Sequence, residues 1–217
     1  MVSDQPGVAE RMASTRLLPV LTVDDAGQAV PLGETLLQGG LDLAEVTFRT
    51  PTAEDALRAM ATVPGLCVGA GTVLRIDQVD RAVDAGARFI VTPGLNADVV
   101  RRCLALSVPV FPGVATATEV MRATDLGLDV VKLFPAEHLG GVRMLAALGA
   151  PFPALRFVPT GGIDAASALS YLRHPAVLAV GGSWMAPAGL VRAGDWEQIR
   201  RLTAAAVDAL ASLEVPR

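Results

Sequence analysis

The sequence has few of the residues from which metal sites and disulfide frameworks are built. Its 217 residues include 2 cysteines and 2 histidines, and His138 and His174 have no cysteine or histidine at ligand spacing. A catalytic zinc ion takes about three ligands from the protein, so a zinc-dependent mechanism is disfavoured and we expect no metal. Cys67 and Cys103 lie in or beside apolar segments, which predicts buried free thiols.

Long apolar runs and clustered positive charge are also absent. No run of eighteen apolar residues occurs, so no membrane span is expected. The first fifteen residues are polar and lack the apolar region of a secretory signal. The net charge is −4 and the basic residues are scattered, which argues against a nucleic-acid partner. We therefore expect a cytoplasmic protein with neither a membrane nor a nucleic-acid partner.

Lysine is the scarcest charged residue. Of 18 basic residues only one is a lysine, Lys132. It lies in Val130–Phe134, an apolar, β-branched stretch that is typical of a buried strand. Burial disfavours the charged form of an amine, and a neutral amine is a nucleophile toward ketones. Lys132 is therefore the first candidate for a catalytic residue; the alternatives are a buried salt bridge and a side chain that reaches the surface.

Apolar segments recur along the whole chain. They are apolar throughout rather than alternating, which is typical of strands buried on both faces of a parallel sheet. The predicted strands are Leu17–Val23, Leu43–Phe48, Cys67–Val73, Phe89–Pro93, Val108–Val114, Val130–Phe134, Arg156–Pro159 and Ala176–Val180. The stretches between them have helical spacing, and the predicted helices are Asp24–Gln38, Thr52–Ala61, Ile76–Ala85, Ala97–Leu106, Thr118–Leu126, Gly141–Leu148, Asp164–Leu172 and Asp195–Leu210. Asn96, Thr116 and Asp164 are predicted N-caps.

Eight strands that alternate with eight helices predict an α/β fold, a closed (β/α)8 TIM barrel. A doubly wound open sheet is the structural alternative. No linker or low-complexity stretch interrupts the sequence, so we predict a single domain over residues 1–217. Within residues 1–16, the segment 5–15 is predicted to form an extra helix that covers the bottom of the barrel.

Polar residues stand at the carboxyl ends of the predicted strands, where barrel active sites gather. Glu45 lies among apolar residues of the second strand and is a candidate general acid/base, or else the structural partner of Lys132. Arg49 follows that strand and could bind a substrate carboxylate with two hydrogen bonds. Thr72 follows a Gly-Ala-Gly turn and could bind the same carboxylate. The alternatives for these two are a solvated arginine and an ordinary turn threonine.

Glycine pairs follow the seventh and eighth predicted strands. Barrel enzymes frequently bind phosphate at these two strand ends through backbone amides and a helix N-terminus. The candidate phosphate ligands lie in Thr160–Gly162 and in Gly182-Ser183, and tight turns without a ligand are the alternative. Pro93 and Phe134 stand at strand ends as well, where they could shape the pocket or merely stiffen a loop and fill the barrel wall.

These motifs together resemble the 2-keto-3-deoxy-6-phosphogluconate (KDPG) / 4-hydroxy-2-oxoglutarate (KHG) aldolase family. The matching stretches are Glu45–Thr50, Gly69–Val73, Thr92–Gly94, Phe111–Gly113, Val131–Glu137, Pro159–Ile163 and Gly181–Trp184. One departure is Ala115, where the family often has serine. The family is typically a homotrimer, so the resemblance implies a homotrimer here.

The resemblance also implies a mechanism that needs no cofactor. Lys132 would form a Schiff base with a 2-keto acid, and Glu45 would move protons during carbinolamine formation and carbon–carbon cleavage. Arg49 and Thr72 would hold the pyruvyl carboxylate, and the substrate phosphate would lie on Gly161, Gly162, Gly182 and Ser183. Phosphogluconate-type, galactonate-type and hydroxyoxoglutarate substrates all stay open. So do two other functions: a phosphate-binding isomerase or synthase without covalent chemistry, and a non-catalytic sugar-phosphate sensor.

Overall fold

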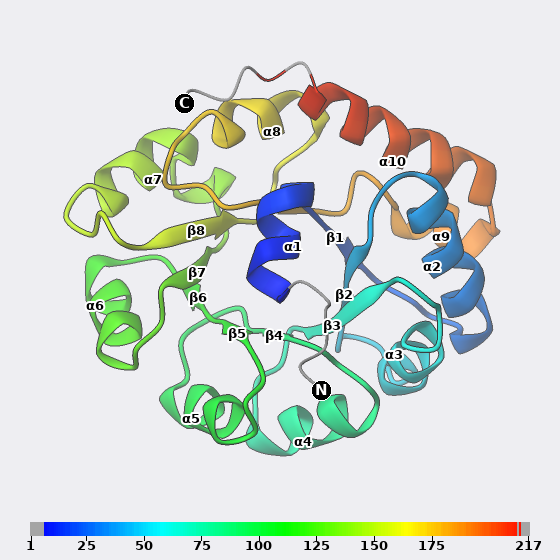
Figure 1. Ribbon diagram of the computed structural model, residues 1–217, viewed down its shortest axis with the longest axis horizontal. Helices are drawn as coiled ribbons and strands as arrows, with labels where there is room; N and C mark the ends of the chain where they lie inside the picture. The colour runs from blue at the N-terminus through cyan, green and yellow to red at the C-terminus, as the bar shows by residue number, and fades with distance from the viewer. Residues whose placement is uncertain (1–6, 212, 214–217) are drawn as a thin grey trace.

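Parallel strands surround the centre of the molecule and helices surround the strands (Figure 1). The computed structural model describes residues 7–211 and residue 213. The strands are β1 Leu17–Leu21, β2 Leu43–Thr47, β3 Cys67–Gly71, β4 Ile90–Val91, β5 Val110–Phe111, β6 Gly113–Val114, β7 Val130–Leu133, β8 Arg156–Pro159 and β9 Val180–Gly182. The helices are α1 Val8–Thr15, η1 Ala26–Gln28, α2 Ala29–Gln38, α3 Ala53–Met60, α4 Ile76–Asp84, α5 Ala97–Ala105, α6 Ala117–Asp125, η2 Glu137–Leu139, α7 Gly141–Gly149, α8 Ala165–Leu172, α9 Ala188–Ala193 and α10 Trp196–Ala211.

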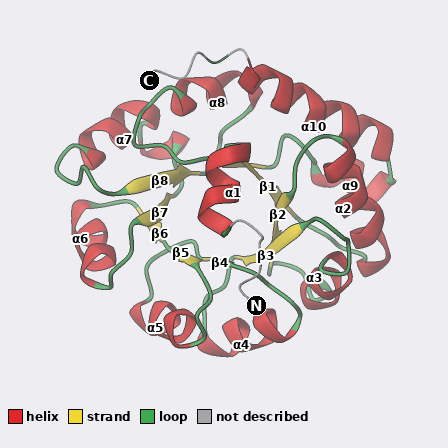
Figure 2. Cartoon of the chain, in the orientation of Figure 1, coloured by secondary structure: helices red, strands yellow, loops and turns green. Residues whose placement is uncertain are grey.

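The strands form two parallel sheets in the described part of the chain. Six strands pair in the order β5-β4-β3-β2-β1-β9, and three pair in the order β6-β7-β8. Isolated parallel bridges, Phe157 with Val177 and Thr160 with Gly181, join β8 to the segment around β9. The result is an α/β fold with a curled parallel sheet and helices on its outer side (Figure 2).

Several predicted boundaries were wrong. The predicted strand Val108–Val114 is split into β5 and β6 on either side of Pro112, because proline has no N–H to donate to a ladder. In the predicted strand Phe89–Pro93, only Ile90–Val91 form a regular strand. In place of the predicted strand Ala176–Val180, the observed strand begins at Val180, the last residue of the predicted range. The runs of apolar residues therefore predicted where the strands lie. The ends of the strands depend on hydrogen bonds to other segments, which no local pattern contains.

Side-chain alternation directs Glu45 toward the centre of the molecule. Leu43 of β2 belongs to the inner apolar cluster, whereas Ala44 and Val46 belong to the outer cluster between the sheet and the helices. Since successive side chains of a strand point to opposite faces, Glu45 shares the inner face with Leu43.

The same alternation directs Lys132 inward from β7. Val130 belongs to the inner cluster, and Val131 and Leu133 belong to a second outer cluster, separate from that of Ala44 and Val46. Lys132 therefore lies on the inner face, two residues further along the strand than Val130, which belongs to the apolar layer that fills the centre. The lysine and the glutamate meet above that layer because both strands are parallel and follow the same alternation.

A helix near the N-terminus closes the opposite end of the centre. Helix α1 crosses the middle of the molecule in the view of Figure 1, and its Met12 is fully buried in the inner cluster. Arg11 fixes this helix, since its Nη1 donates to Asp42 Oδ2 at 2.6 Å and to the Gly65 carbonyl at 3.4 Å. The helix falls within the predicted range 1–16, of which residues 1–6 lie outside the described part.

The helix caps were predicted correctly. Asn96 accepts hydrogen bonds from the N–H groups of Asp98 and Val99, and Thr116 and Asp164 each cap a helix with the side-chain oxygen. Cys67 and Cys103 are buried free thiols, as predicted. Over the described residues, none of the helices combines the length and the apolar character that crossing a membrane would require.

Candidate active site

Lys132 lies near the carboxyl end of β7 and is 5% exposed. Its backbone pairs in register with Gly113 of β6 and Val158 of β8. The Nζ atom lies 3.6 Å from Glu45 Oε1 and 5.2 Å from the centroid of the Phe134 ring. Because both charged side chains are almost fully removed from water, their attraction is weakly screened.

Glu45 has an unusual environment for a carboxylate. It is 1% exposed, and neither oxygen receives a hydrogen bond from any described residue. The 3.6 Å separation from Nζ is also longer than a hydrogen bond. A buried carboxylate that served only structure would be expected to have such partners. Oxygens that make no hydrogen bond are able to take up and release a proton.

Arg49 and Thr72 follow neighbouring strand ends. Thr47, at the end of β2, pairs in register with Gly71, at the end of β3, so the two turns begin side by side. Arg49 is exposed and makes no ion pair with any described residue. Thr72 has a φ of +57°, a left-handed conformation that is rare for a β-branched residue and is typically maintained at functional sites.

The two glycine turns lie next to each other. The bridge between Thr160 and Gly181 brings the end of β8 beside β9, and Gly161 and Gly162 have φ values of +101° and +80°. Within the described chain, the backbone N–H groups of Gly162 and Ser183 donate to no acceptor. These amides are available to an anion.

The helix that follows β8 contributes less to an anion site than the sequence suggested. Its first turn is already capped, since Asp164 accepts from the Ser167 N–H at 2.8 Å. This backbone hydrogen bond is the main cause that lowers the pKa of Asp164, which keeps a negative charge at the helix N-terminus. The amides of Gly162 and Ser183, rather than those of α8, are therefore the donors that the structure offers to an anion.

Pro93 enters the site through a glycine. A side chain on Gly113 would overlap the backbone carbonyl of Pro93, so the missing side chain lets the β4–α5 loop approach β6. Gly113 pairs with Lys132, and Pro93 is thus positioned near the lysine. In the sequence, Gly113 stands out only as part of the stretch Phe111–Gly113. A glycine at an inward-facing strand position is itself a signal that something approaches closely.

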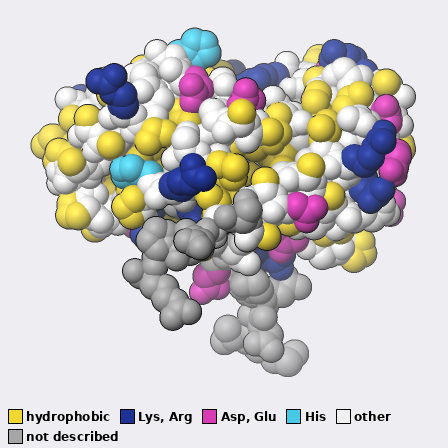
Figure 3. Space-filling view, turned by 90° about the horizontal axis from the view of Figure 1, so that it is seen from above, with side chains coloured by type: hydrophobic (Ala, Val, Ile, Leu, Met, Phe, Trp, Pro, Cys, Tyr) yellow, Lys and Arg dark blue, Asp and Glu magenta, His cyan; other side chains and the backbone are white. Residues whose placement is uncertain are grey.

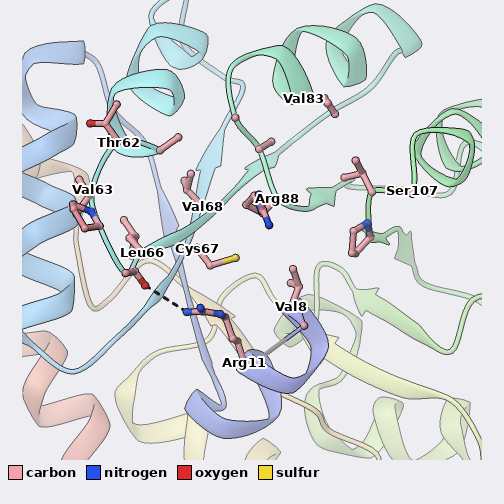
Figure 4. A pocket seen from close by; sticks show the side chains of 18 residues that line it. Val8, Arg11, Thr62, Val63, Leu66, Cys67, Val68, Val83, Arg88 and Ser107 are labelled. Atoms are coloured by element: carbon pink, nitrogen blue, oxygen red, sulfur yellow. Dashed lines mark hydrogen bonds between the residues drawn. The ribbon is translucent and has the colours of Figure 1, made fainter. Parts of the chain in front are cut away.

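A cavity of about 860 Å³ lies at the other end of the molecule (Figure 4). Its lining includes Arg11 of α1, Cys67 at the start of β3, and Arg88 and Ser107, which precede β4 and β5. It shares no residue with the Lys132 site.

On the face shown in Figure 3, basic side chains are scattered among acidic and apolar ones. Among residues 7–211 and 213, no cluster of three or more histidine, cysteine, aspartate or glutamate side chains could hold a metal ion.

Known proteins match this chain over nearly its whole length. A model of the KDPG and KHG aldolase family matches residues 8–202. The 2-dehydro-3-deoxy-phosphogluconate aldolase of Treponema pallidum is 47% identical over 197 residues, 90% of this chain and 94% of that protein. The KHG/KDPG aldolase of Escherichia coli is 43% identical over 193 residues, 88% of this chain and 91% of that protein.

A solved structure agrees with these relatives. The KDPG aldolase of Legionella pneumophila, with pyruvate captured at low pH as a covalent carbinolamine intermediate, has a TM-score of 0.88 and 37% identity to this chain. The match covers 91% of this chain and 97% of that one. The parallel α/β fold and the relatives together define a lyase. The chain belongs to the KDPG and KHG aldolase family, which confirms the resemblance stated above.

Proposed function

We propose that this protein is a class I, lysine-dependent aldolase that reversibly cleaves KDPG to pyruvate and glyceraldehyde 3-phosphate. It also cleaves 4-hydroxy-2-oxoglutarate to pyruvate and glyoxylate. The observation that carries the proposal is the single lysine of the chain, buried on the inner face and 3.6 Å from an otherwise unpartnered glutamate. The curated relatives, named for the same reactions, support it.

The reaction begins when the Lys132 ammonium group gives a proton to Glu45 and the neutral Nζ attacks the C2 ketone. The hydroxyl of the carbinolamine takes this proton back from Glu45 and leaves as water, which gives a protonated imine that withdraws electrons from the neighbouring carbons. Glu45, through a water molecule, takes the proton of the C4 hydroxyl as the C3–C4 bond breaks. The bonding electrons form the enamine of pyruvate, and the aldehyde departs. Protonation of the enamine at C3 and hydrolysis of the imine release pyruvate and the free lysine.

The remaining site residues bind the two ends of the substrate. Arg49 and Thr72 bind the pyruvyl carboxylate, since a guanidinium matches a carboxylate with two hydrogen bonds. Pro93 and Phe134 form the apolar walls beside the imine. The open amides of Gly162 and Ser183 support a phosphate site at the glycine turns, to which Thr160, Gly161 and Gly182 also contribute.

We propose further that the two sheets close into one eight-stranded (β/α)8 barrel that forms a single domain over residues 1–217. Strands β5 and β6 then act as one strand interrupted at Pro112, and the bridges between β8 and β9 support the closure.

We also propose that the assembly is a homotrimer, and the exposed side chains of Leu74, Ile76, Leu104 and Met121 offer apolar surface for it. Light scattering coupled to size-exclusion chromatography tests the trimer, because the mass of a single chain would contradict it.

Steady-state assays test the reaction. The wild-type protein should release pyruvate from both substrates, and Lys132→Arg should reduce turnover to background, because it keeps the positive charge and removes the nucleophile. If Lys132→Arg keeps wild-type turnover, the lysine acts only as a charge and a non-covalent function is the correct one. If no pyruvate is released at high protein concentration, the sensor function is favoured instead.

A further inference from the structure

Gly71 lies where a side chain would collide with the glutamate. It is the last residue of β3 and pairs in register with Thr47, two residues beyond Glu45. A Cβ at this position would overlap Oε1 of Glu45 and would lie 2.5 Å from its Cγ and 2.6 Å from its Cδ. The three atoms nearest to this position all belong to the glutamate side chain.

The backbone of Gly71 does not itself require glycine. Its φ lies outside the left-handed region, unlike that of the following residue, Thr72. Alanine could adopt the same backbone conformation, so the nearest obstacle to a side chain here is Glu45. The absence of a side chain therefore serves the glutamate rather than the strand.

The glutamate depends on this space because little else fixes it. No described residue donates a hydrogen bond to either carboxylate oxygen, and Lys132 lies at 3.6 Å. The carboxylate is held by its packing, and β3 forms one wall of that packing. A methyl group on this wall would move the carboxylate off its present position relative to Nζ.

We propose that Gly71 is a positioning residue, which sets the place of the Glu45 carboxylate relative to Lys132 during proton transfer. The inference rests on the proposed role of Glu45 in the aldolase reaction. Carbinolamine formation and the later removal of the C4 hydroxyl proton both need proton transfer by this carboxylate, and both follow the binding of the substrate. Displacement of the carboxylate should therefore reduce kcat more than substrate binding.

Gly69, two residues before Gly71 on β3, provides a matched control. A side chain on Gly69 would overlap the ring of Phe89, a fully buried residue of the inner apolar cluster, and not the glutamate. Gly69→Ala thus introduces the same methyl group against the core instead of the carboxylate. It should lower stability while the active molecules keep a normal pH profile.

The experiment compares Gly71→Ala, Gly69→Ala, Glu45→Asp and the double variant Glu45→Asp/Gly71→Ala. For Gly71→Ala we expect at least about a tenfold loss of kcat, since a positioned acid/base group contributes roughly 10²–10⁴-fold. We also expect a KM within about threefold of wild type and an altered pH profile of kcat. Aspartate is one methylene shorter, so the double variant should be no worse than Gly71→Ala alone. Wild-type kcat with an unchanged pH profile in Gly71→Ala, or losses that simply multiply in the double variant, would overturn the proposal.

A stability measurement keeps the test decisive if Gly71→Ala does not fold. Glu45→Ala removes the group with which the methyl collides, so adding Gly71→Ala to Glu45→Ala should cause little further loss of stability. If Gly71→Ala lowers the free energy of unfolding of Glu45→Ala as much as it lowers that of the wild type, the proposal is wrong. Borohydride trapping of pyruvate on the wild-type protein tests the aldolase function separately from the positioning role of Gly71. Absence of that adduct sinks the aldolase function itself, whereas an adduct with a fully active Gly71→Ala sinks only the positioning role.

Discussion

Replacing Lys132 with methionine should destabilise the protein, because it leaves the Glu45 carboxylate buried without its counter-charge. The side chains of Lys132 and Glu45 are 6% and 1% exposed, so water cannot take the place of the ammonium group. Removing one partner of a buried ion pair costs about 3–5 kcal/mol. We expect Lys132→Met to lower the free energy of unfolding by about this amount, although methionine fills much of the same volume.

The double variant Glu45→Gln/Lys132→Met is the matched control. It removes both charges and keeps the approximate shape of both side chains, so it should recover most of the lost stability. Equilibrium urea titrations of the wild type, the two single variants and the double variant, followed by circular dichroism, give the coupling between the two residues. If Lys132→Met is as stable as wild type, or if the double variant is no more stable than Lys132→Met, the two groups do not form an ionised pair.

Three further predictions concern binding and pH. Arg49→Ala should raise KM for both substrates by about 10- to 100-fold in initial-rate assays, since a hydrogen bond to a charged group contributes ~1.5–3 kcal/mol; an unchanged KM would exclude Arg49 from the carboxylate site. Ser183→Ala should raise KM for KDPG by about two- to tenfold and leave KM for 4-hydroxy-2-oxoglutarate unchanged; equal effects on both would argue against a phosphate contact. The pKa of Glu119 is lowered from its ordinary value of 4.5, chiefly by a hydrogen bond from the Ala115 N–H. A lowered folded-state pKa stabilises the protein above the ordinary value, and this stabilisation is lost as the pH falls through the lowered one. Wild type should therefore exceed Glu119→Gln in stability at pH 7 and match it in strong acid; a difference independent of pH would contradict this assignment.

Local patterns predicted the elements of this fold well. The uninterrupted apolar segments located the strands, and Asn96, Thr116 and Asp164 cap helices as their side chains suggested. These features depend on neighbours only a few residues away, which a sequence displays directly. The short helices η2 and α9 were missed because each lies in a connection without a helical repeat of apolar residues.

The site was only partly predictable for a related reason. Lys132 and Glu45 stood out as charged residues in apolar strands, and strand alternation explains why both face inward. The separation of 3.6 Å and the missing hydrogen bonds of Glu45 depend on packing between segments 87 positions apart. The same holds for the roles of Gly71 and Gly113, because a glycine does not reveal in sequence which distant atom fills the space beside it.

The most direct test uses the single lysine of the chain. The wild-type protein is incubated with pyruvate and reduced with borohydride, and its intact mass and peptide map are measured. The mechanism predicts a stable pyruvyl adduct on the peptide that contains Lys132, and no such adduct in Lys132→Arg. The terminal α-amino group is the only other primary amine and maps to a different peptide. A folded wild-type protein that forms no adduct at Lys132 would contradict the Schiff-base mechanism.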